Sequence, residues 1–341
     1  MTDAFEPERF FPRDLFERIT DTRITRPEVV AEEAAGRRRR PKLTRDGRLT
    51  ILAADHPARM VVGVGDDPLA MGSRWKLLAR ILRVVTAGEF DGVMTTPDIL
   101  EELLIVNRLD RELGGPGFLD HKVLIGCMNR GGLSGAAFEM DDRMTAFTPE
   151  RLAQLRLDGA KVMFRLEVRE RESLDAMMYC VEAINACHAR GIPVFLEALM
   201  VEHTDGKYKT LKNAEALIKV VGVAAGLGAS TALTWLKIPY CEGYERVAEA
   251  TTFPILMLGG ESRGDPTGIF QEFAAGMRAG STVRGALVGR NVTFPGKEDP
   301  LAVALAVDGI VHRGFTAEQA AAHLREVRGR GMDRFTRLLA A

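Results

Sequence analysis

Short runs of mostly apolar residues recur along the chain from residue 49 onward, and longer stretches with helical spacing separate them. The runs cover residues 49–54, 92–95, 122–127, 160–166, 193–199, 232–238, 254–258 and 285–288. Apolar runs of this length are typical of parallel strands that are buried on both faces of a sheet. The pattern therefore predicts eight such strands.

The intervening stretches have the length and spacing of helices, as at residues 72–87, 149–157, 173–190, 213–227 and 265–279. Eight strands that alternate with helices predict a (β/α)8 TIM barrel. The alternative is a doubly wound open sheet, for which six of these strands would suffice. No GxGxxG motif follows an early strand, however, and Gly63-Val64-Gly65 lacks the third glycine. The pattern thus favours the barrel.

Residues 1–47 differ from the rest and predict an N-terminal extension before a catalytic barrel domain at residues 48–341. The extension contains four consecutive arginines, Arg37 to Arg40. Acidic residues lie nearby and no aromatic stacking platform accompanies the run, which argues against a nucleic-acid site. We expect a solvated helix end, or a contact with a neighbouring subunit or a phosphate. Barrels of this kind commonly assemble, so we expect a homo-oligomer in which Phe10 and Phe11 cap a neighbour.

Composition narrows the class of protein. The 341 residues include 46 Lys and Arg against 47 Asp and Glu, a net charge of −1 that attracts neither nucleic acid nor an anionic membrane. With 46% hydrophobic and 27% charged residues, the chain is typical of a globular protein. Its four cysteines form no CxxC pair and are expected to be buried thiols. An acidic N-terminus and the lack of a long apolar run predict a cytoplasmic location.

Lys237 is the most informative candidate, because it lies inside the apolar run 232–238. In a barrel the active site forms at the carboxyl ends of the strands. Burial disfavours the ammonium and lowers the pKa of a lysine, and the neutral amine can form a Schiff base with a carbonyl. The alternative is a lysine in an ion pair at the barrel mouth. Lys161 is a second candidate, and two adjacent ammonium groups would depress each other's pKa.

Asp55 and Glu197 end two other strands and would face inward in the expected register. A carboxylate beside an iminium can remove a hydroxyl proton during carbon–carbon cleavage and return it later. Glu197 is the stronger candidate for this acid–base role. The alternative for each is a structural partner to a barrel lysine or arginine.

The last two strands end in Gly259-Gly260 and Gly289-Arg290, where barrels commonly hold a phosphate on backbone N–H groups. Glycine allows close approach of the backbone, and arginine adds a bidentate contact. The six histidines show neither HxH nor i, i+4 spacing, so we expect no metal and no cofactor.

Five segments together resemble the class I (Schiff-base) aldolase superfamily. They are Leu52-Ala53-Ala54-Asp55-His56, Gly159-Ala160-Lys161-Val162, Pro193-Val194-Phe195-Leu196-Glu197, Leu236-Lys237-Ile238-Pro239 and Val288-Gly289-Arg290-Asn291. That superfamily includes deoxyribose-phosphate, archaeal-type fructose-bisphosphate and tagatose-bisphosphate aldolases. Lys161, in the fourth predicted strand, and Phe195-Leu196-Glu197, in the fifth, look most like the tagatose-bisphosphate aldolases. The whole chain also resembles an actinobacterial group of (β/α)8 proteins that is linked to inositol catabolism. The superfamily resemblance spans roughly residues 49–312.

The resemblance implies an aldehyde-lyase that cleaves a phosphorylated keto sugar, with Lys237 forming the imine and Glu197 moving the proton. Asp55 and Lys161 would support them, while Gly259, Gly260, Gly289 and Arg290 would hold the phosphate. The inositol link implies 2-deoxy-5-keto-gluconate 6-phosphate, which yields dihydroxyacetone phosphate and malonate semialdehyde. Residues 258–262 and the loop Asn129-Arg130-Gly131-Gly132 depart from the superfamily pattern. A barrel with other carbonyl chemistry, such as isomerisation, and a non-catalytic sugar-phosphate-binding protein remain as alternatives.

Overall fold

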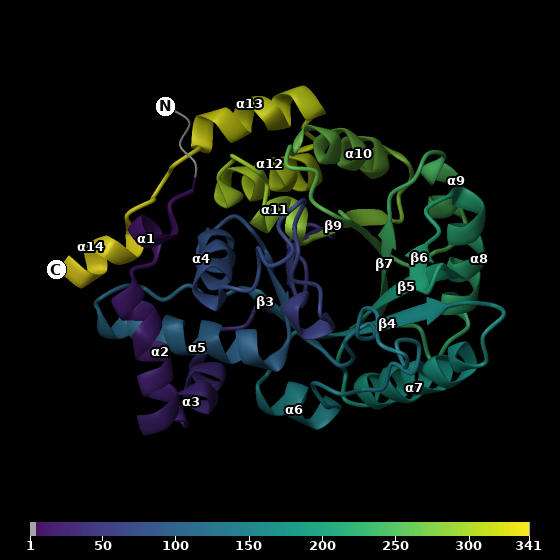
Figure 1. The fold of residues 1–341 in the computed structure, drawn as a ribbon, viewed down its shortest axis with the longest axis horizontal. Coiled ribbons are helices and arrows are strands. Elements are labelled where there is room, and N and C mark those ends of the chain that lie inside the picture. Colours follow the sequence, from purple (N-terminus) through teal and green to yellow (C-terminus); the bar gives the residue numbers. More distant parts are fainter. Residues whose placement is uncertain (1–4, 341) are drawn as a thin grey trace.

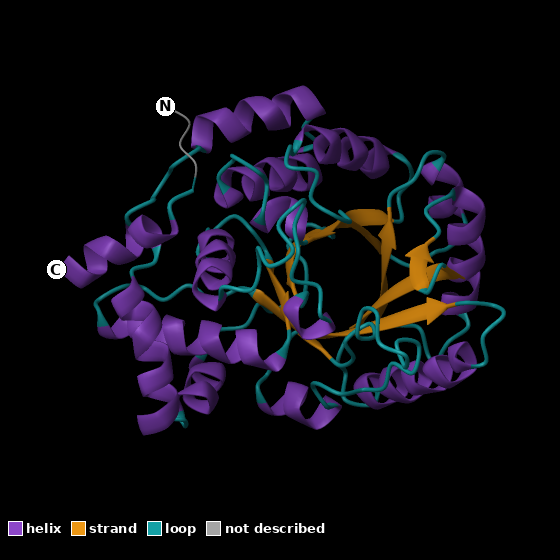
Figure 2. Cartoon of the chain, viewed as in Figure 1, coloured by secondary structure: helices purple, strands orange, loops and turns teal. Residues whose placement is uncertain are grey.

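The computed structural model describes residues 5–340 and shows a closed (β/α)8 TIM barrel (Figures 1 and 2). Its eight parallel strands are β1 (Leu49–Ala54), β2 (Gly92–Thr95), β3 (Val123–Cys127), β4 (Gly159–Leu166), β5 (Val194–Thr204), β7 (Thr234–Pro239), β8 (Ile255–Leu258) and β9 (Val283–Val288). Pairing of β4 with β5 joins the two ends of the strand order and closes the ring. Closure confirms the barrel and excludes the doubly wound open sheet.

Helices surround the ring of strands (Figure 2). Those that follow barrel strands are α4 (Arg74–Val85), α5 (Pro97–Glu112), α6 (Pro149–Gln154), α7 (Glu172–His188), α8 (Ala214–Ala225), α9 (Tyr244–Glu249), α10 (Thr267–Arg278), α11 (Arg290–Thr293) and α12 (Pro300–Arg313). Two more helices, α13 (Ala317–Val327) and α14 (Arg334–Ala340), end the described chain. None of the helices within residues 5–340 has the length and apolar content of a membrane span.

Strand β5 differs most from its expected bounds. The apolar run predicts an end at residue 199, but the strand continues to Thr204 and turns back into β6 (Lys207–Thr210), which pairs with it antiparallel. The extra residues Glu202 and His203 are exposed. An exposed hairpin needs no apolar run, because backbone pairing rather than burial holds it together. Every other strand end lies within two residues of its expected position.

Alternation along each strand divides the core into two layers. Ile51 and Ala53 of β1 point into the barrel and pack with Phe195, Leu256 and other inward side chains. Leu52 and Ala54 point outward and pack in the larger layer beneath the helices. The strand ring therefore has apolar contacts on both faces, which is why its strands are nearly uninterrupted apolar runs.

Gly285 allows the ring to close between β9 and β1. A Cβ atom at this position would lie 1.9 Å from the carbonyl oxygen of Leu49, and the residue has a φ of +140°. Only glycine has no Cβ to collide there. Close pairing of β1 and β9 thus depends on this residue.

The N-terminal extension packs against its own chain. Of its helices, α2 (Arg13–Thr25) and α3 (Val29–Gly36) pack on α5, and α1 (Pro7–Phe10) packs on α14, so the first and last described helices are neighbours (Figure 1). Phe10 and Phe11 are buried, and both rings lie edge-on to Phe335 of α14 at 5.3 and 5.7 Å. The expectation that they cap a neighbouring subunit is therefore wrong, since this apolar surface is covered within the chain.

The arginine run Arg37–Arg40 lies at the amino end of the barrel, where it forms ion pairs with aspartates that precede the strands. Asp158 pairs with Arg37 and Arg39, Asp120 with Arg38, and Asp91 with Arg40. The expected solvated helix end is wrong for Arg37 and Arg40, whose side chains are buried. Asp91 and Asp158 also accept hydrogen bonds from strand N–H groups, and the arginines balance their charge.

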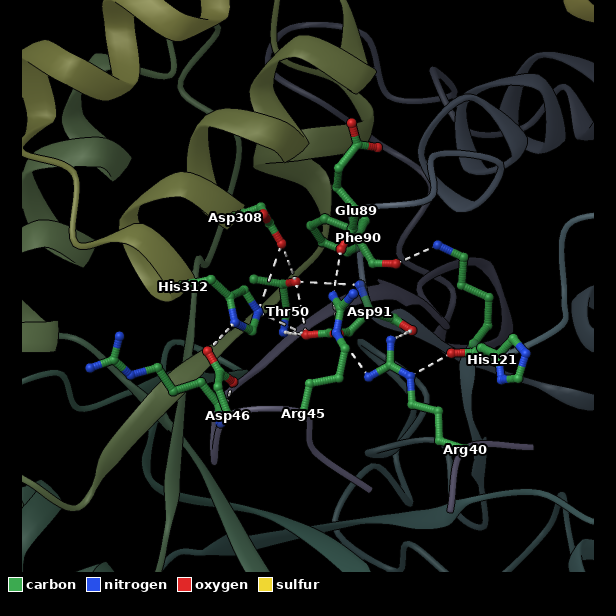
Figure 3. A network of polar contacts seen from close by, with 12 residues as sticks. Arg40, Arg45, Asp46, Thr50, Glu89, Phe90, Asp91, His121, Asp308 and His312 are labelled. Carbon is green, nitrogen blue, oxygen red and sulfur yellow. Dashed lines mark hydrogen bonds and ion pairs between the residues drawn. The ribbon is translucent and has the colours of Figure 1, made fainter. Parts of the chain in front are cut away.

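Asp91 is the centre of a polar network that joins β1 to α12 (Figure 3). Its carboxylate accepts hydrogen bonds from Thr50 N and His312 Nε2 at 2.9 Å each, and His312 also contacts Asp46 at 2.8 Å. Burial alone would lower the pKa of His312, but the hydrogen bonds to Asp91 and Asp46 outweigh it and raise that pKa to about 9. Asp308, 3.7 Å from His312, adds to the effect.

This network predicts a pH-dependent stability. Because the pKa of His312 rises from 6.5 to about 9 on folding, the imidazolium stabilises the fold fully below about pH 6.5 and loses this effect as the pH rises through about 9. Between these limits the wild type should lose about 2–3 kcal/mol more than His312→Gln in urea unfolding. His323→Gln, which removes a histidine paired with the exposed Glu326 of α13, is the control. Equal pH slopes for the wild type and His312→Gln would contradict the prediction.

Candidate active site

Four ionisable side chains meet at the carboxyl end of the barrel because of strand register. Glu197 of β5 lies directly opposite Lys237 of β7, so both side chains point to the same face. Lys161 of β4 lies opposite Phe195, one inward position deeper than Glu197. Asp55 directly follows β1. The structure thus brings together the four residues that the sequence analysis singled out for chemistry.

These groups form a continuous chain of ion pairs. Lys237 Nζ donates a hydrogen bond to Glu197 Oε2 at 2.8 Å. The same oxygen lies 3.2 Å from Lys161 Nζ, which in turn is 3.3 Å from Asp55 Oδ2. All four residues are at most 5% exposed. Glu197 is therefore shared between two ammonium groups, and Lys161 between two carboxylates.

The charges determine the protonation states. Burial raises the pKa of a carboxyl group, but Lys237 and Lys161 outweigh burial and lower the pKa of Glu197 to about 2. Burial is likewise outweighed at Asp55, whose pKa lies well below its usual range because of Lys161. For Lys161, burial is outweighed by Glu197 and Asp55, which raise its pKa above the usual value. The expectation of a depressed pKa at Lys161 is therefore wrong, because the two carboxylates outweigh burial.

A cavity of about 630 Å³ opens above this cluster. Lys237, Glu197 and Asp55 line it, whereas Lys161 is fully buried and does not. Of the two lysines, only Lys237 therefore presents its amine to a molecule in the cavity. Lys161 lies below the floor, where it holds the two carboxylates.

The glycines expected to bind phosphate also line this cavity, together with Arg290. A Cβ on Gly289 would lie 2.6 Å from the His56 ring, and Gly260 has a φ of +69°. Both positions therefore favour glycine, which leaves the backbone open to a ligand. Nε of Arg290 is buried and has no hydrogen-bond partner among the described residues. An anion in the cavity could satisfy that N–H group.

Among the further cavity residues that the sequence did not indicate as site residues are three with basic side chains: His56, Arg59 and Lys212. Burial lowers the pKa of His56 to about 4, so its imidazole is neutral at neutral pH. Arg59 reaches from the loop after β1 to the carbonyl oxygen of Gly131, at 3.5 Å. Lys212 follows the β5–β6 hairpin, and its Nζ lies 3.3 Å from the position of a Cβ on Gly260. Neither loop has a periodic pattern that could place these side chains.

The loop Asn129–Gly132 supports the rim. The side chain of Asn129 bonds to both backbone groups of Met163 in the neighbouring strand β4. Gly131 and Gly132 have φ values of +73° and +74°, and a Cβ on either would collide with Met163 or Arg165. The departure of this loop from the superfamily pattern therefore has a structural reason, namely its close packing against β4.

The four cysteines are buried and unpaired, as expected from their spacing. Burial raises the pKa of each thiol, most strongly at Cys127 and Cys180. Within residues 5–340, no three His, Cys, Asp or Glu side chains are grouped as metal ligands. Within this part of the chain, the charged groups at the cavity floor are therefore Lys237, Glu197 and Asp55, with Lys161 beneath them, rather than a thiolate or a metal-ligand group.

Comparison with known proteins places the sequence in a family. A family model described as Cgl0159-like matches residues 47–311. The crystal structure of Cgl0159 from Corynebacterium glutamicum (Brevibacterium flavum) is 36% identical, with a TM-score of 0.82, and the match covers 89% of this chain and 98% of that one. The chain belongs to the Cgl0159-like family. A search of curated protein sequences finds no match.

This Cgl0159-like chain also shares its fold with Schiff-base aldolases. An archaeal fructose-1,6-bisphosphate aldolase, whose catalytic lysine is bound to the carbinolamine intermediate, has a TM-score of 0.55 at 18% identity, covering 83% of this chain and 99% of that one. A fructose-bisphosphate aldolase from Slackia heliotrinireducens has a TM-score of 0.58 at 14% identity, covering 90% and 91%. The resemblance seen in the sequence is confirmed at the level of the fold.

The cluster of Lys161, Lys237, Glu197 and Asp55 predicts that replacing Lys161 destabilises this Cgl0159-like protein more than replacing Lys237. Lys161→Met leaves two buried carboxylates without their shared cation and should destabilise the fold by about 3–5 kcal/mol. In Lys237→Met, Glu197 keeps Lys161 as its partner, so we expect a loss of about 1–2 kcal/mol. Urea unfolding of both variants and the wild type measures the difference. Equal losses, or a larger loss in Lys237→Met, would show that Lys161 does not hold the cluster together.

Proposed function

We propose that this protein is a class I aldolase that cleaves a phosphorylated keto sugar through a Schiff base on Lys237. One observation carries the proposal: the amine that faces the cavity lies 2.8 Å from an ionised carboxylate, Glu197. An imine-forming lysine needs a nearby base to remove its proton before attack and to return one afterwards. Membership of a family whose fold matches Schiff-base aldolases supports the same chemistry.

The reaction begins when Glu197 accepts a proton from Lys237 and the free amine attacks the ketone carbon. The carbinolamine loses water as Glu197 returns that proton to the departing hydroxyl group, which leaves an iminium. Glu197, or a water that it orients, then removes the proton of the β-hydroxyl group. The electron pair of the bond between the α and β carbons moves into the iminium, giving an enamine and an aldehyde. Protonation of the enamine and hydrolysis release the second product.

Asp55 and Lys161 act through Glu197 in this scheme. Lys161 is held by both carboxylates and has no access to the cavity, so it fixes the position of Glu197 and keeps it ionised. Asp55 holds Lys161 from the other side. Once Glu197 has returned its proton and is ionised again, the Lys161 ammonium helps to balance its charge.

The phosphate would bind where Gly259, Gly260, Gly289 and Arg290 line the cavity. Lys212 adds a cation beside Gly260, and no ion pair links it to another described residue. Glycine backbone and the cations Arg290 and Lys212, of which Arg290 also pairs with the exposed Glu261, together suit a phosphate dianion. Arg59 reaches toward Gly131 at the end of β3, which is opposite β8 in the ring of strands.

Cations on two sides of the cavity favour a substrate with two anionic groups. 2-Deoxy-5-keto-gluconate 6-phosphate is such a molecule, with its phosphate next to the ketone and a carboxylate at the far end. Cleavage between C3 and C4 would give dihydroxyacetone phosphate and malonate semialdehyde. In this arrangement Arg59 would hold the carboxylate.

Reductive trapping tests the imine directly. Sodium borohydride with dihydroxyacetone phosphate should add a stable mass to the wild type and to Lys161→Ala, but not to Lys237→Ala, because only Lys237 faces the cavity. Intact-mass spectrometry measures the adduct, and peptide mapping locates it. In Glu197→Gln we expect trapping to slow by about 100-fold, as for loss of a general base.

Two outcomes would overturn the assignment. Loss of the adduct only in Lys161→Ala would move the imine to β4. No adduct with any keto phosphate would reject the aldolase and leave a phosphate-binding barrel. Release of malonate semialdehyde from the keto-acid phosphate, against none from fructose bisphosphate, would establish the finer substrate assignment.

The position of Lys212 predicts that its replacement weakens the trapping of phosphorylated ketones but not of unphosphorylated ones. Lys212→Met should raise the dihydroxyacetone phosphate concentration for half-maximal trapping about tenfold, because one charged contact is lost. Trapping of dihydroxyacetone, which has no phosphate, should not change. Lys76→Met, at an exposed lysine of α4, is the matched control. Equal effects on both ketones would remove Lys212 from the phosphate site.

A further inference from the structure

A second cavity lies at the opposite end of the barrel from the catalytic site. It has a volume of about 720 Å³, within the range of small-molecule sites. The N-terminal extension forms one wall, and the segments that lead into β2 and β3 form the others, with Arg334 from the C-terminal helix. The residues from 38 to 45 and Arg334 lie outside the segment that the family model matches.

The charged residues that line this cavity are mostly basic. Six basic side chains face it: Arg38, Arg40, Lys42, Arg45, Lys122 and Arg334. Within residues 5–340, their ion pairs involve three carboxylates: Asp91 pairs with both Arg40 and Arg45, Asp120 with Arg38, and Asp110 with Arg334. Positive charge therefore exceeds negative charge at the cavity. Figure 3 shows Arg40 and Arg45 converging on Asp91.

The excess charge is not neutralised by other described groups. Lys42 is exposed and forms no ion pair with any residue in the range 5–340. Lys122 donates only to the backbone carbonyls of Ala87 and Phe90, and burial, then the nearby Arg40, lower its pKa to about 7. Nε of Arg334 is buried and has no hydrogen-bond partner in the part of the chain that the structure describes. An anion would satisfy these groups together.

The geometry suits a small molecule rather than a polymer. The cavity is bounded by segments from both ends of the chain, and Pro41, Pro116 and the buried Phe118 give it an apolar side. Arginine and lysine grouped in this way bind the oxygens of phosphate groups, and several cations suit several phosphates. We propose that this cavity binds a polyphosphate group, carried by a molecule of about nucleotide size.

Isothermal titration calorimetry with inorganic tripolyphosphate and with ATP tests the site. The wild type should show saturable binding that Arg290→Gln retains, and the affinity should fall as the salt concentration rises. Lys42→Ala should weaken binding about tenfold, and Arg38→Gln combined with Lys42→Ala should weaken it further. Since Lys42 is exposed and unpaired, its replacement leaves the fold intact, which melting without ligand verifies.

Two control variants distinguish binding at this site from binding in the catalytic cavity. Lys76→Ala removes an exposed lysine of α4 that does not line the second cavity and should leave binding unchanged. Arg290→Gln removes a cation from the catalytic cavity and should also leave it unchanged. Tighter binding of ATP than of tripolyphosphate would identify a nucleotide, and equal binding would identify the phosphate chain alone. No saturable binding of either probe, or loss of binding in Arg290→Gln but not in Lys42→Ala, would overturn the proposal.

Discussion

The ammonium of Lys161 is the interaction on which the catalytic end of the barrel depends. It is fully buried, and a buried charge is stable only when it is paired. Asp55 and Glu197 provide that pairing from β1 and β5, so the lysine joins strands that are far apart in the ring. The same charge keeps Glu197 ionised, and Glu197 in turn lies beside the lysine that faces the cavity.

The two ends of the barrel differ in how their buried charges are balanced. At the amino end, aspartates that accept strand N–H groups are balanced by arginines of the extension, so Arg37 and Arg40 fasten that segment to the strands. At the carboxyl end, the lysines lie inside the ring and the carboxylates balance them. The extension is therefore part of the barrel's electrostatics, which its charged and irregular sequence does not reveal.

Much of the fold and part of the site could be predicted because each depends on local pattern. The apolar runs placed all eight barrel strands, since a strand that is buried on both faces must be apolar along its length. Lys237 stood out because a charge inside such a run is costly. The β5–β6 hairpin was not foreseen, because exposed backbone pairing needs no apolar run, and Lys212 was missed with it.

The sequence by itself determined the eight barrel strands, the five helices near residues 72–87, 149–157, 173–190, 213–227 and 265–279, and the lysine and carboxylate candidates at strand ends. It could do so because spacing and composition are properties of neighbouring residues. Only the tertiary structure decided that Lys161 lies beneath the cavity and Lys237 faces it. The two lysines differ by one inward position on β4 and β7, the strands on either side of β5, and this difference depends on the register of pairing. The structure likewise decided that Phe10 and Phe11 pack on the C-terminal helix, because contacts between the two ends of a chain leave no local pattern.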